Sequence, residues 1–376
     1  MRNLSAVMFF VDFCKAFDII SHRCMFAILK AYGIPDILVS AIQSVYERLK
    51  ARVTSPDGET DYFKIYAGVM QGDTLAPFLF VIVLDYAMRR AIQGKEEELG
   101  FTIHPRRGRR AGAKSICDLD FADDIVLMSN TVKQAQKLLL SVEEECKKVG
   151  LMLNSGKTKS MFLNIDAEEL KNGTGDAILQ ALTESGDQDF LYLGSWCDKL
   201  RDMKTRKALA WRSLNKLDKI WKSNIDVNLK VLLFRATTET ILLYGSQTWA
   251  LTVAEEKHLN GTYTRMLRKV KNISWSDKVD NKTLYGKIKP ICWTIKERRL
   301  RLAGHIQRDK SSPAHKTVLW QPKHGSASRG RPTTTLVDTL LRDTGQMSTA
   351  ELNAMMMNRA VWRKLCEARS PGFAQK

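Results

Sequence analysis

The chain has no Cys-x-x-Cys pair and no long apolar run. Its seven cysteines are scattered and odd in number, which excludes a regular disulfide framework and indicates a reduced, intracellular protein, nuclear or cytoplasmic. The apolar run before Asp12 is too short for a membrane span or a signal peptide, so we expect no membrane partner. One cysteine and three histidines between residues 292 and 324 are spaced too irregularly for a compact finger, so we expect no zinc site.

Tryptophan is absent before residue 196, and acidic residues are scarce after residue 198. Residues 199–376 carry 36 Lys and Arg against 14 Asp and Glu, a net charge of +22, whereas residues 1–198 carry 23 against 27, a net charge of −4. A basic half of this length predicts binding to a polyanion such as nucleic acid. The eight late tryptophans either stack on bases or pack between helices, and packing is the commoner role.

Two adjacent carboxylates, Asp123 and Asp124, separate two short apolar runs. Strand-forming runs around two turn-forming residues predict a tight hairpin with both acids at its tip. Neighbouring carboxylates repel unless a cation neutralises them. A third acid, Asp12, ends another apolar run, and three such acids could share two Mg²⁺ ions. An isolated Asp-Asp pair is more often a solvated turn, so the remaining motifs decide between these interpretations.

Five segments resemble, in order, the polymerase motifs A to D and the following primer-grip region of reverse transcriptases: Phe10–Asp18, Ala67–Pro77, Phe121–Asp124, Gly150–Lys159 and Phe190–Gly194. Motif C has Phe121 where the family more often has Tyr. Their spacing is similar to that of the non-LTR (LINE-type) retrotransposon enzymes. The resemblance is strong over the first half of the chain and weaker over the second.

The resemblance implies an RNA-directed DNA polymerase that joins deoxynucleotides to a primer 3′-hydroxyl. It implies an RNA template, a DNA primer, their duplex and dNTPs as partners, and two Mg²⁺ ions, or Mn²⁺, held by Asp12, Asp123 and Asp124. It also implies substrate-binding roles for Phe17 under the sugar, Gln71 and Gly72 against the incoming nucleotide, and Lys157 beside the leaving pyrophosphate, with Leu193 and Gly194 in the primer grip.

Each of these last roles has a plainer alternative. Phe17 is equally an ordinary core residue, Gln71 and Gly72 a helix-entry turn, and Lys157 a solvated side chain. The acids Asp18 and Asp120 are interpreted as structural or turn acids rather than ligands.

The expected fold class is α+β: a polymerase palm with an antiparallel sheet backed by helices, then a basic helical thumb and a C-terminal helical region. The expected domains are 1–198 (palm, fingers missing), 199–309 (thumb), 310–332 (linker) and 333–376. Helices are expected over 22–31, capped by Ser21, over 37–49, from Pro77, and over 132–149, started by Thr131. The helix over 37–49 is expected to be amphipathic, with one apolar face formed by Ile37, Leu38, Ala41, Ile42, Val45 and Leu49.

Motif A begins about ten residues from Met1, so we expect a fragment without fingers or endonuclease, with weak or no polymerisation by itself. Two alternatives stay open. One is a non-catalytic nucleic-acid-binding remnant that uses only the basic half. The other is a group II intron maturase-like polymerase, which is disfavoured because Ile241–Gly245 and Arg329–Pro332 look more like retrotransposon C-termini.

Overall fold

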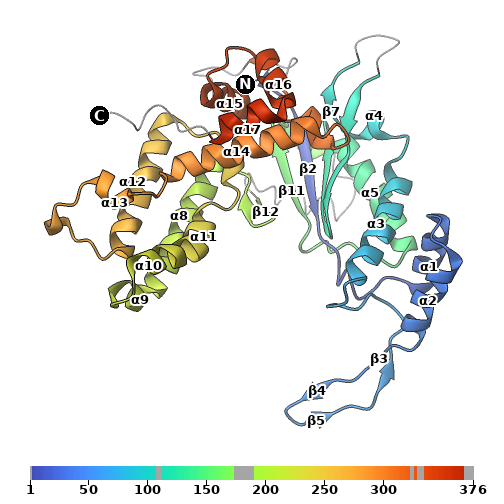
Figure 1. Cartoon of the computed structure of the whole chain (residues 1–376). Helices are drawn as coiled ribbons and strands as arrows, with labels where there is room; N and C mark the ends of the chain where they lie inside the picture. Colours follow the sequence, from blue (N-terminus) through green and yellow to red (C-terminus); the bar gives the residue numbers. More distant parts are fainter. Residues whose placement is uncertain (1, 107–111, 173–189, 322–325, 328–333, 368–376) are drawn as a thin grey trace. The chain divides into compact units, whose positions relative to one another are not determined.

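The computed structural model describes residues 2–106, 112–172, 190–321, 326–327 and 334–367, and its chain divides into two compact units (Figure 1). The N-terminal unit comprises residues 3–188, and the C-terminal unit comprises residues 1–2 and 189–376. The three motif acids therefore lie in the N-terminal unit, and the Leu193-Gly194 turn lies in the C-terminal unit. No helix in the described residues is both long and apolar enough to cross a membrane.

A four-stranded antiparallel sheet forms the centre of the N-terminal unit. Its strand order is β11-β2-β10-β9, with β11 at Lys159–Leu163, β2 at Ala6–Val11, β10 at Asp124–Ser129 and β9 at Asp118–Phe121. The apolar run before Asp12 thus forms β2 and the run after Asp124 forms β10, and these are the two central strands. The predicted hairpin is confirmed as β9 and β10, but only Asp123 lies in its loop, because Asp124 already pairs with Phe121 as the first residue of β10.

Helices cover one face of this sheet. Alternate residues of β2 and β10 point into a single apolar core with α1 (His22–Ala31), α3 (Ala76–Ile92) and α5 (Val132–Lys148): Val7, Phe9, Val11, Ile125 and Leu127. Figure 1 shows α3 and α5 beside the strands. An antiparallel sheet backed by helices confirms the expected α+β class.

The helix starts follow local rules of the sequence. The Ser21 side chain accepts a hydrogen bond from the Cys24 amide, and the Thr131 side chain accepts one from the Gln134 amide, so each satisfies an otherwise unpaired helix N–H. Pro77 lies in the first turn of α3, where its missing N–H costs nothing. These three expected helix starts are confirmed.

The helix α2 (Asp36–Glu47) corrects one detail. Its apolar stripe predicted a buried face, but Ile37 is 79% exposed and Val45 is 52% exposed, whereas Val39 and Tyr46 enter the core. The remaining elements of the unit are short: β3 (Lys50–Ala51), β4 (Thr54–Ser55), β5 (Gly58–Glu59), β6 (Phe63–Lys64), α4 (Glu96–Leu99), β7 (Phe101–His104), β8 (Lys114–Ile116) and α6 (Ala167–Asn172).

The C-terminal unit is mainly helical. After the hairpin β12 (Leu191–Tyr192) and β13 (Ser195–Trp196), its helices are α8 (Lys199–Lys216), α9 (Asp218–Lys222), α10 (Val227–Phe234), a π-helix (Arg235–Glu239), α11 (Thr240–Leu242), α12 (Val253–Val270), α13 (Asn281–Tyr285), α14 (Ile291–Arg308), α15 (Leu336–Thr344), α16 (Thr349–Met357) and α17 (Arg359–Glu367). Short 3₁₀ turns occupy Ser246–Thr248, Trp275–Asp277 and Pro313–Lys316. Strand β1 (Arg2–Asn3) pairs with β14 (Ser326–Ala327).

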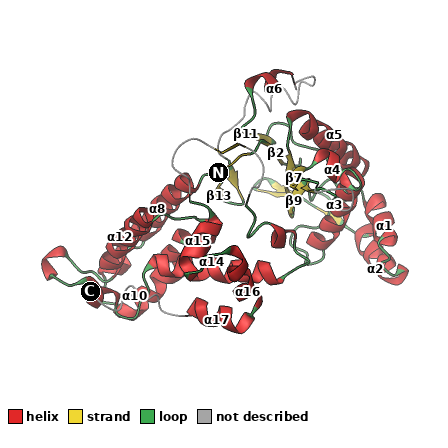
Figure 2. Ribbon diagram, turned by 90° about the horizontal axis from the view of Figure 1, so that it is seen from above, coloured by secondary structure: helices red, strands yellow, loops and turns green. Residues whose placement is uncertain are grey.

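Two apolar clusters hold this unit together. One joins α8 to α12 and the start of α14, and the other joins the end of α14 to α15, α16 and α17. Figure 2 shows α8 and α12 next to each other. Trp221, Trp249 and Trp362 are at most 2% exposed, so packing is the role of these three, while Trp275 is 94% exposed.

Candidate active site

Asp12 and Asp124 occupy neighbouring positions on the same face of the central sheet. β2 and β10 pair with Val11 opposite Ile125, so the next pair along is Asp12 and Asp124. Val11 and Ile125 both face the helices, and side chains alternate along a strand. Asp12 and Asp124 therefore lie on the opposite face, away from α3 and α5.

Asp123 is held beside them by the two-residue hairpin loop. Phe121 pairs with Asp124, which leaves Ala122 and Asp123 as the loop. Ala122 has a φ of 56°, a left-handed conformation that costs a non-glycine residue about 1 kcal/mol. Such strain at a loop that carries acidic residues points to a functional requirement for its shape.

Asp124 is affected electrostatically by the other two acids. Burial, and then the charges of Asp123 and Asp12, raise the pKa of Asp124. Within the described residues, no three His, Cys, Asp or Glu side chains already stand as a ligand set. Carboxylate oxygens are the donors that Mg²⁺ takes. The donor chemistry therefore fits a divalent cation.

A loop distant in sequence holds Asp12 in place. Asn154 donates from its side chain to Asp12 Oδ2 at 3.2 Å and from its backbone N–H to the Asp12 carbonyl at 2.8 Å, while the Asp12 N–H donates to Thr158 Oγ1 at 3.3 Å. Lys157 Nζ lies 3.9 Å from Asp12 Oδ2 and its side chain is 72% exposed. The sequence placed Lys157 near the acids by resemblance but gave no role to Asn154, which lies 142 positions from Asp12.

Phe17 combines two environments. Its ring stacks on Phe80 of α3, with centroids 4.5 Å apart and planes 18° apart, yet the residue stays half-buried. It therefore packs against the core, as the plainer alternative expects, while keeping part of its surface open.

The two glycines of segment 67–72, Gly68 and Gly72, differ in the space around them. A Cβ on Gly68 would lie 2.6 Å from the Asp18 carbonyl oxygen, whereas a Cβ on Gly72 would meet nothing within 4 Å. The side chain of Gln71 donates to Asp18 Oδ1 at 3.2 Å, so Asp18 is a structural partner, as expected. Gly68 thus serves the packing of this chain, and the space at Gly72 is open to a ligand.

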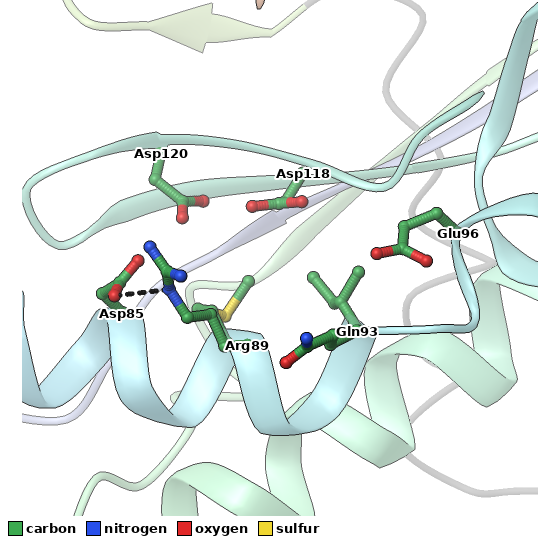
Figure 3. Close-up of a pocket in the computed structure, with 8 residues that line it drawn as sticks. Asp85, Arg89, Gln93, Glu96, Asp118 and Asp120 are labelled. Atoms are coloured by element: carbon green, nitrogen blue, oxygen red, sulfur yellow. Dashed lines mark hydrogen bonds and ion pairs between the residues drawn. The ribbon is translucent and has the colours of Figure 1, made fainter. Parts of the chain in front are cut away.

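Asp118 and Asp120 face the other side of the sheet. They pair with Leu127 and Ile125, so they point toward α3 and line a cavity of about 280 Å³ with Asp85 (Figure 3). Burial, the Asp118 charge and a hydrogen bond to Asp118 raise the pKa of Asp120 to about 7. Asp120 is therefore separated from the three motif acids by the sheet, in agreement with its expected structural role.

The turn Leu193-Gly194 belongs to the C-terminal unit. Tyr192 pairs with Ser195 across it, and both turn residues have left-handed φ values, 48° for Leu193 and 76° for Gly194. Glycine adopts this conformation freely, but leucine pays about 1–2 kcal/mol. The conformation of Leu193 therefore requires support from its surroundings.

Comparison with known proteins gives a consistent result. The sequence profile described as "Reverse transcriptase (RNA-dependent DNA polymerase)" matches residues 2–197. A transposon-derived protein of Caenorhabditis elegans is 26% identical over 246 residues, covering 62% of this chain and 87% of that protein. The Pol polyprotein of the type-2 retrotransposable element R2DM of Drosophila melanogaster is 33% identical over 147 residues, covering 39% of this chain and 13% of that protein.

Among solved structures, telomerase from Candida tropicalis in complex with a fragment of telomeric RNA matches 84% of this chain and 49% of its own, with 12% identity and a TM-score of 0.39. That similarity is too low to support an argument about function. The chain spans about one eighth of the R2DM polyprotein's length.

Proposed function

Because the chain belongs to the reverse transcriptase family, as a non-LTR retrotransposon polymerase fragment, we propose that it carries the RNA-directed DNA polymerase site of such an element. The observation that supports this most directly is the placement of Asp12 and Asp124 on the sheet face away from α3 and α5, with Asp123 in the adjoining loop, where burial and then the charges of Asp123 and Asp12 raise the pKa of Asp124. The reaction joins a dNTP to the 3′-hydroxyl of a primer paired with RNA.

The three carboxylates hold the divalent cations that this family uses. When bound, two Mg²⁺ or Mn²⁺ ions supply charge stabilisation to the attacking and leaving oxygens of the phosphoryl transfer. Asn154 keeps the Asp12 carboxylate on this face through its side-chain amide. Lys157, 3.9 Å from Asp12, supplies positive charge where pyrophosphate leaves.

The substrate contacts that we propose are the ones that the family resemblance implies for these side chains. Phe17, fixed by its stacking on Phe80, blocks a 2′-hydroxyl on the incoming sugar. Gln71 and the open backbone at Gly72 lie against the nucleotide. The Leu193-Gly194 turn grips the primer. From the family resemblance we assign RNA template, DNA primer and dNTPs as the substrates of this chain.

A primer-extension assay tests this proposal, with an RNA template, a DNA primer, dNTPs and Mg²⁺ or Mn²⁺. The test variant is Asp123→Asn/Asp124→Asn, and the matched control is Asp118→Asn/Asp120→Asn, which changes two acids of the same hairpin on the opposite face. We expect the weak extension of the wild type to be retained in the control variant and lost in the test variant. Equal activity in both variants, or equal loss, would refute the assignment of the metal ligands.

A second candidate function is nucleic-acid binding without catalysis. Residues 199–376 carry a net charge of +22. Burial, and then the charges of Arg265 and Lys204, lower the pKa of Lys207, so α8 and α12 bring together positive charges that are not fully neutralised. Salt-sensitive RNA binding that is the same in wild type and the Asp123→Asn/Asp124→Asn variant, with no extension by either, would favour this candidate.

A further inference from the structure

The Leu193-Gly194 turn has an unusual sequence for its shape. Positive φ values at both central residues are the mark of a type I′ turn, for which Asn-Gly and Asp-Gly are the preferred sequences. Leu at the first position does not favour this conformation. The C-terminal unit must therefore hold the turn from outside, and three of its side chains do so.

Two side chains hold the two carbonyl oxygens of the turn. The Tyr244 hydroxyl donates to the Leu193 carbonyl at 2.6 Å, and the Arg206 guanidinium donates to the Gly194 carbonyl. The guanidinium carbon of Arg206 also lies 4.3 Å from the centre of the Tyr244 ring, so the two supporting side chains stabilise each other. The carbonyl oxygens of both turn residues are thus held by two side chains that contact each other.

A buried carboxylate anchors this arrangement. Asp202 is 1% exposed and accepts hydrogen bonds from Ser195 Oγ at 2.8 Å, from the Trp196 backbone N–H at 3.1 Å and from Trp249 Nε1 at 2.9 Å. Its Oδ1 also lies 3.6 Å from Arg206 Nε. Asp202 thereby joins the returning strand of the hairpin to α8 and to the segment that ends at Trp249.

The segment Tyr244–Trp249 fits closely against the hairpin. Gly245 has a φ of 69°, and a Cβ at this position would lie 2.7 Å from Ser195 Oγ. Glycine allows this bend without strain, and the bend places the Tyr244 hydroxyl and the Trp249 ring on the hairpin. This part of the chain, which looked like a retrotransposon C-terminus in the sequence, thus has a structural partner.

We propose that Tyr244, Arg206 and Asp202 are positioning residues that impose the left-handed conformation on Leu193-Gly194 and so place the primer 3′ end. The inference rests on the proposed function, in which this turn grips the primer. The supporting side chains act through the turn: they hold its carbonyls and leave the exposed Gly194 and Leu191 at the surface.

The test uses the full chain and a DNA primer on an RNA template, with a photoreactive 4-thiothymidine as the primer's last nucleotide. The variant Tyr244→Phe removes only the hydroxyl that donates to Leu193. The matched control is Tyr32→Phe, which removes the hydroxyl of another exposed tyrosine that donates one 2.6 Å hydrogen bond, to Asp85 in the N-terminal unit. Crosslinks are mapped by mass spectrometry, and extension kinetics and duplex affinity are measured in parallel.

We expect the wild type and Tyr32→Phe to crosslink to residues 190–197, and Tyr244→Phe to lose most of that crosslink. In extension, we expect Tyr244→Phe to lower kcat about tenfold, because a lost hydrogen bond releases the turn and small displacements of a reacting group are costly. Duplex affinity should change less than about twofold, because phosphate contacts dominate it.

A turn held by its surroundings also predicts a rescue. Asparagine tolerates left-handed φ, so Leu193→Asn gives the turn its own preference for this shape. In the Leu193→Asn background, Tyr244→Phe should therefore lower kcat and crosslinking only about twofold. A direct contact between Tyr244 and the primer would instead give the same loss in both backgrounds.

The outcomes separate this inference from the proposed function. Absence of a crosslink from the wild type to residues 190–197, or a Tyr244→Phe protein that matches Tyr32→Phe in crosslinking and extension, overturns the inference. If the wild type does not extend the primer, only the proposed catalytic function is refuted. The loss of the crosslink in Tyr244→Phe and its recovery in the Leu193→Asn background then test the positioning role. Asp202→Asn serves as a second variant, and we expect it to lose most of the crosslink to residues 190–197, as Tyr244→Phe does.

Discussion

Gly68 and Gly72 offer a direct test of how the segment between them is built. Both have strongly positive φ values, 88° and 93°, so alanine at either position adopts an unfavourable backbone conformation that costs about 1 kcal/mol. Only at Gly68 would the new Cβ also collide with the chain, since it would lie 2.6 Å from the Asp18 carbonyl oxygen and 2.7 Å from the Asp18 carbonyl carbon.

This collision sets the difference in stability that we expect between Gly68→Ala and Gly72→Ala. All three nearest atoms at Gly68 belong to the Asp18 backbone, which cannot rotate away as a side chain can. Forced displacement of a packed backbone costs about 1–3 kcal/mol, so Gly68→Ala should lower the free energy of unfolding by about 2–4 kcal/mol and Gly72→Ala by about 1 kcal/mol. For a unit of this size, the Tm should fall by about 5–10 °C in the first case and about 2–4 °C in the second.

The assay is thermal unfolding followed by two signals. Far-UV circular dichroism reports both units, whereas tryptophan fluorescence reports only the C-terminal unit, because all eight tryptophans lie at or after residue 196. We expect Gly68→Ala to lower the transition seen by circular dichroism. Equal shifts for the two variants would show that Gly68 is not packed against Asp18 and would refute the reasoning.

The same two variants distinguish an effect on folding from an effect on substrate binding. If the open space at Gly72 receives the incoming nucleotide, a methyl group there should raise the KM for dNTP about tenfold with little loss of stability. A Gly72→Ala protein with an unchanged KM would remove Gly72 from the substrate-binding residues.

Three further predictions concern charge. The pKa of Asp120 is raised from 3.8 to about 7, so the folded state keeps a proton that the unfolded state loses near pH 4, and the free energy of unfolding should fall as the pH rises from about 4 to 7. Because water screens the exposed part of Asp120, we expect the free energy of unfolding, measured with urea, to fall by about 1 kcal/mol over this pH range. The fall should be absent in Asp120→Asn, and a flat pH profile in the wild type would contradict this prediction. Lys157→Ala should slow single-turnover incorporation about 10- to 100-fold and change stability by less than about 0.5 kcal/mol, since its pair with Asp12 is exposed; unchanged incorporation would make Lys157 a solvated side chain. Lys207→Ala/Arg265→Ala should lower the slope of log affinity against log salt for duplex binding by about 1–2, and an unchanged slope would place the nucleic acid elsewhere.

Much of the N-terminal unit could be predicted from the sequence, because its signals are local. The caps Ser21 and Thr131 and the apolar runs before Asp12 and around Asp123 each act within a few residues, and the elements that they predict are present. The resemblance of five ordered segments to the polymerase motifs then sufficed to assign the three acids to one site. No distant contact was needed for these conclusions.

Only the tertiary structure decided which face of each helix or strand is buried and which stays exposed. Asp120 lies three residues before Asp123, yet its strand position turns it toward α3, and the apolar Ile37 of α2 stays at the surface. Periodicity shows that a helix or strand has two faces, but the neighbours that cover a face come from other parts of the chain.

The supports of the candidate site were also invisible in the sequence. Asn154 reaches Asp12 across 142 positions, and Tyr244 reaches Leu193 across 51. Leu193 carries no local preference for the left-handed backbone, so its conformation is a property of its surroundings. The sequence alone determined the reactive groups and the elements that carry them, whereas tertiary contacts decided how those groups are held, because hydrogen bonds between distant residues leave no periodic or local signal.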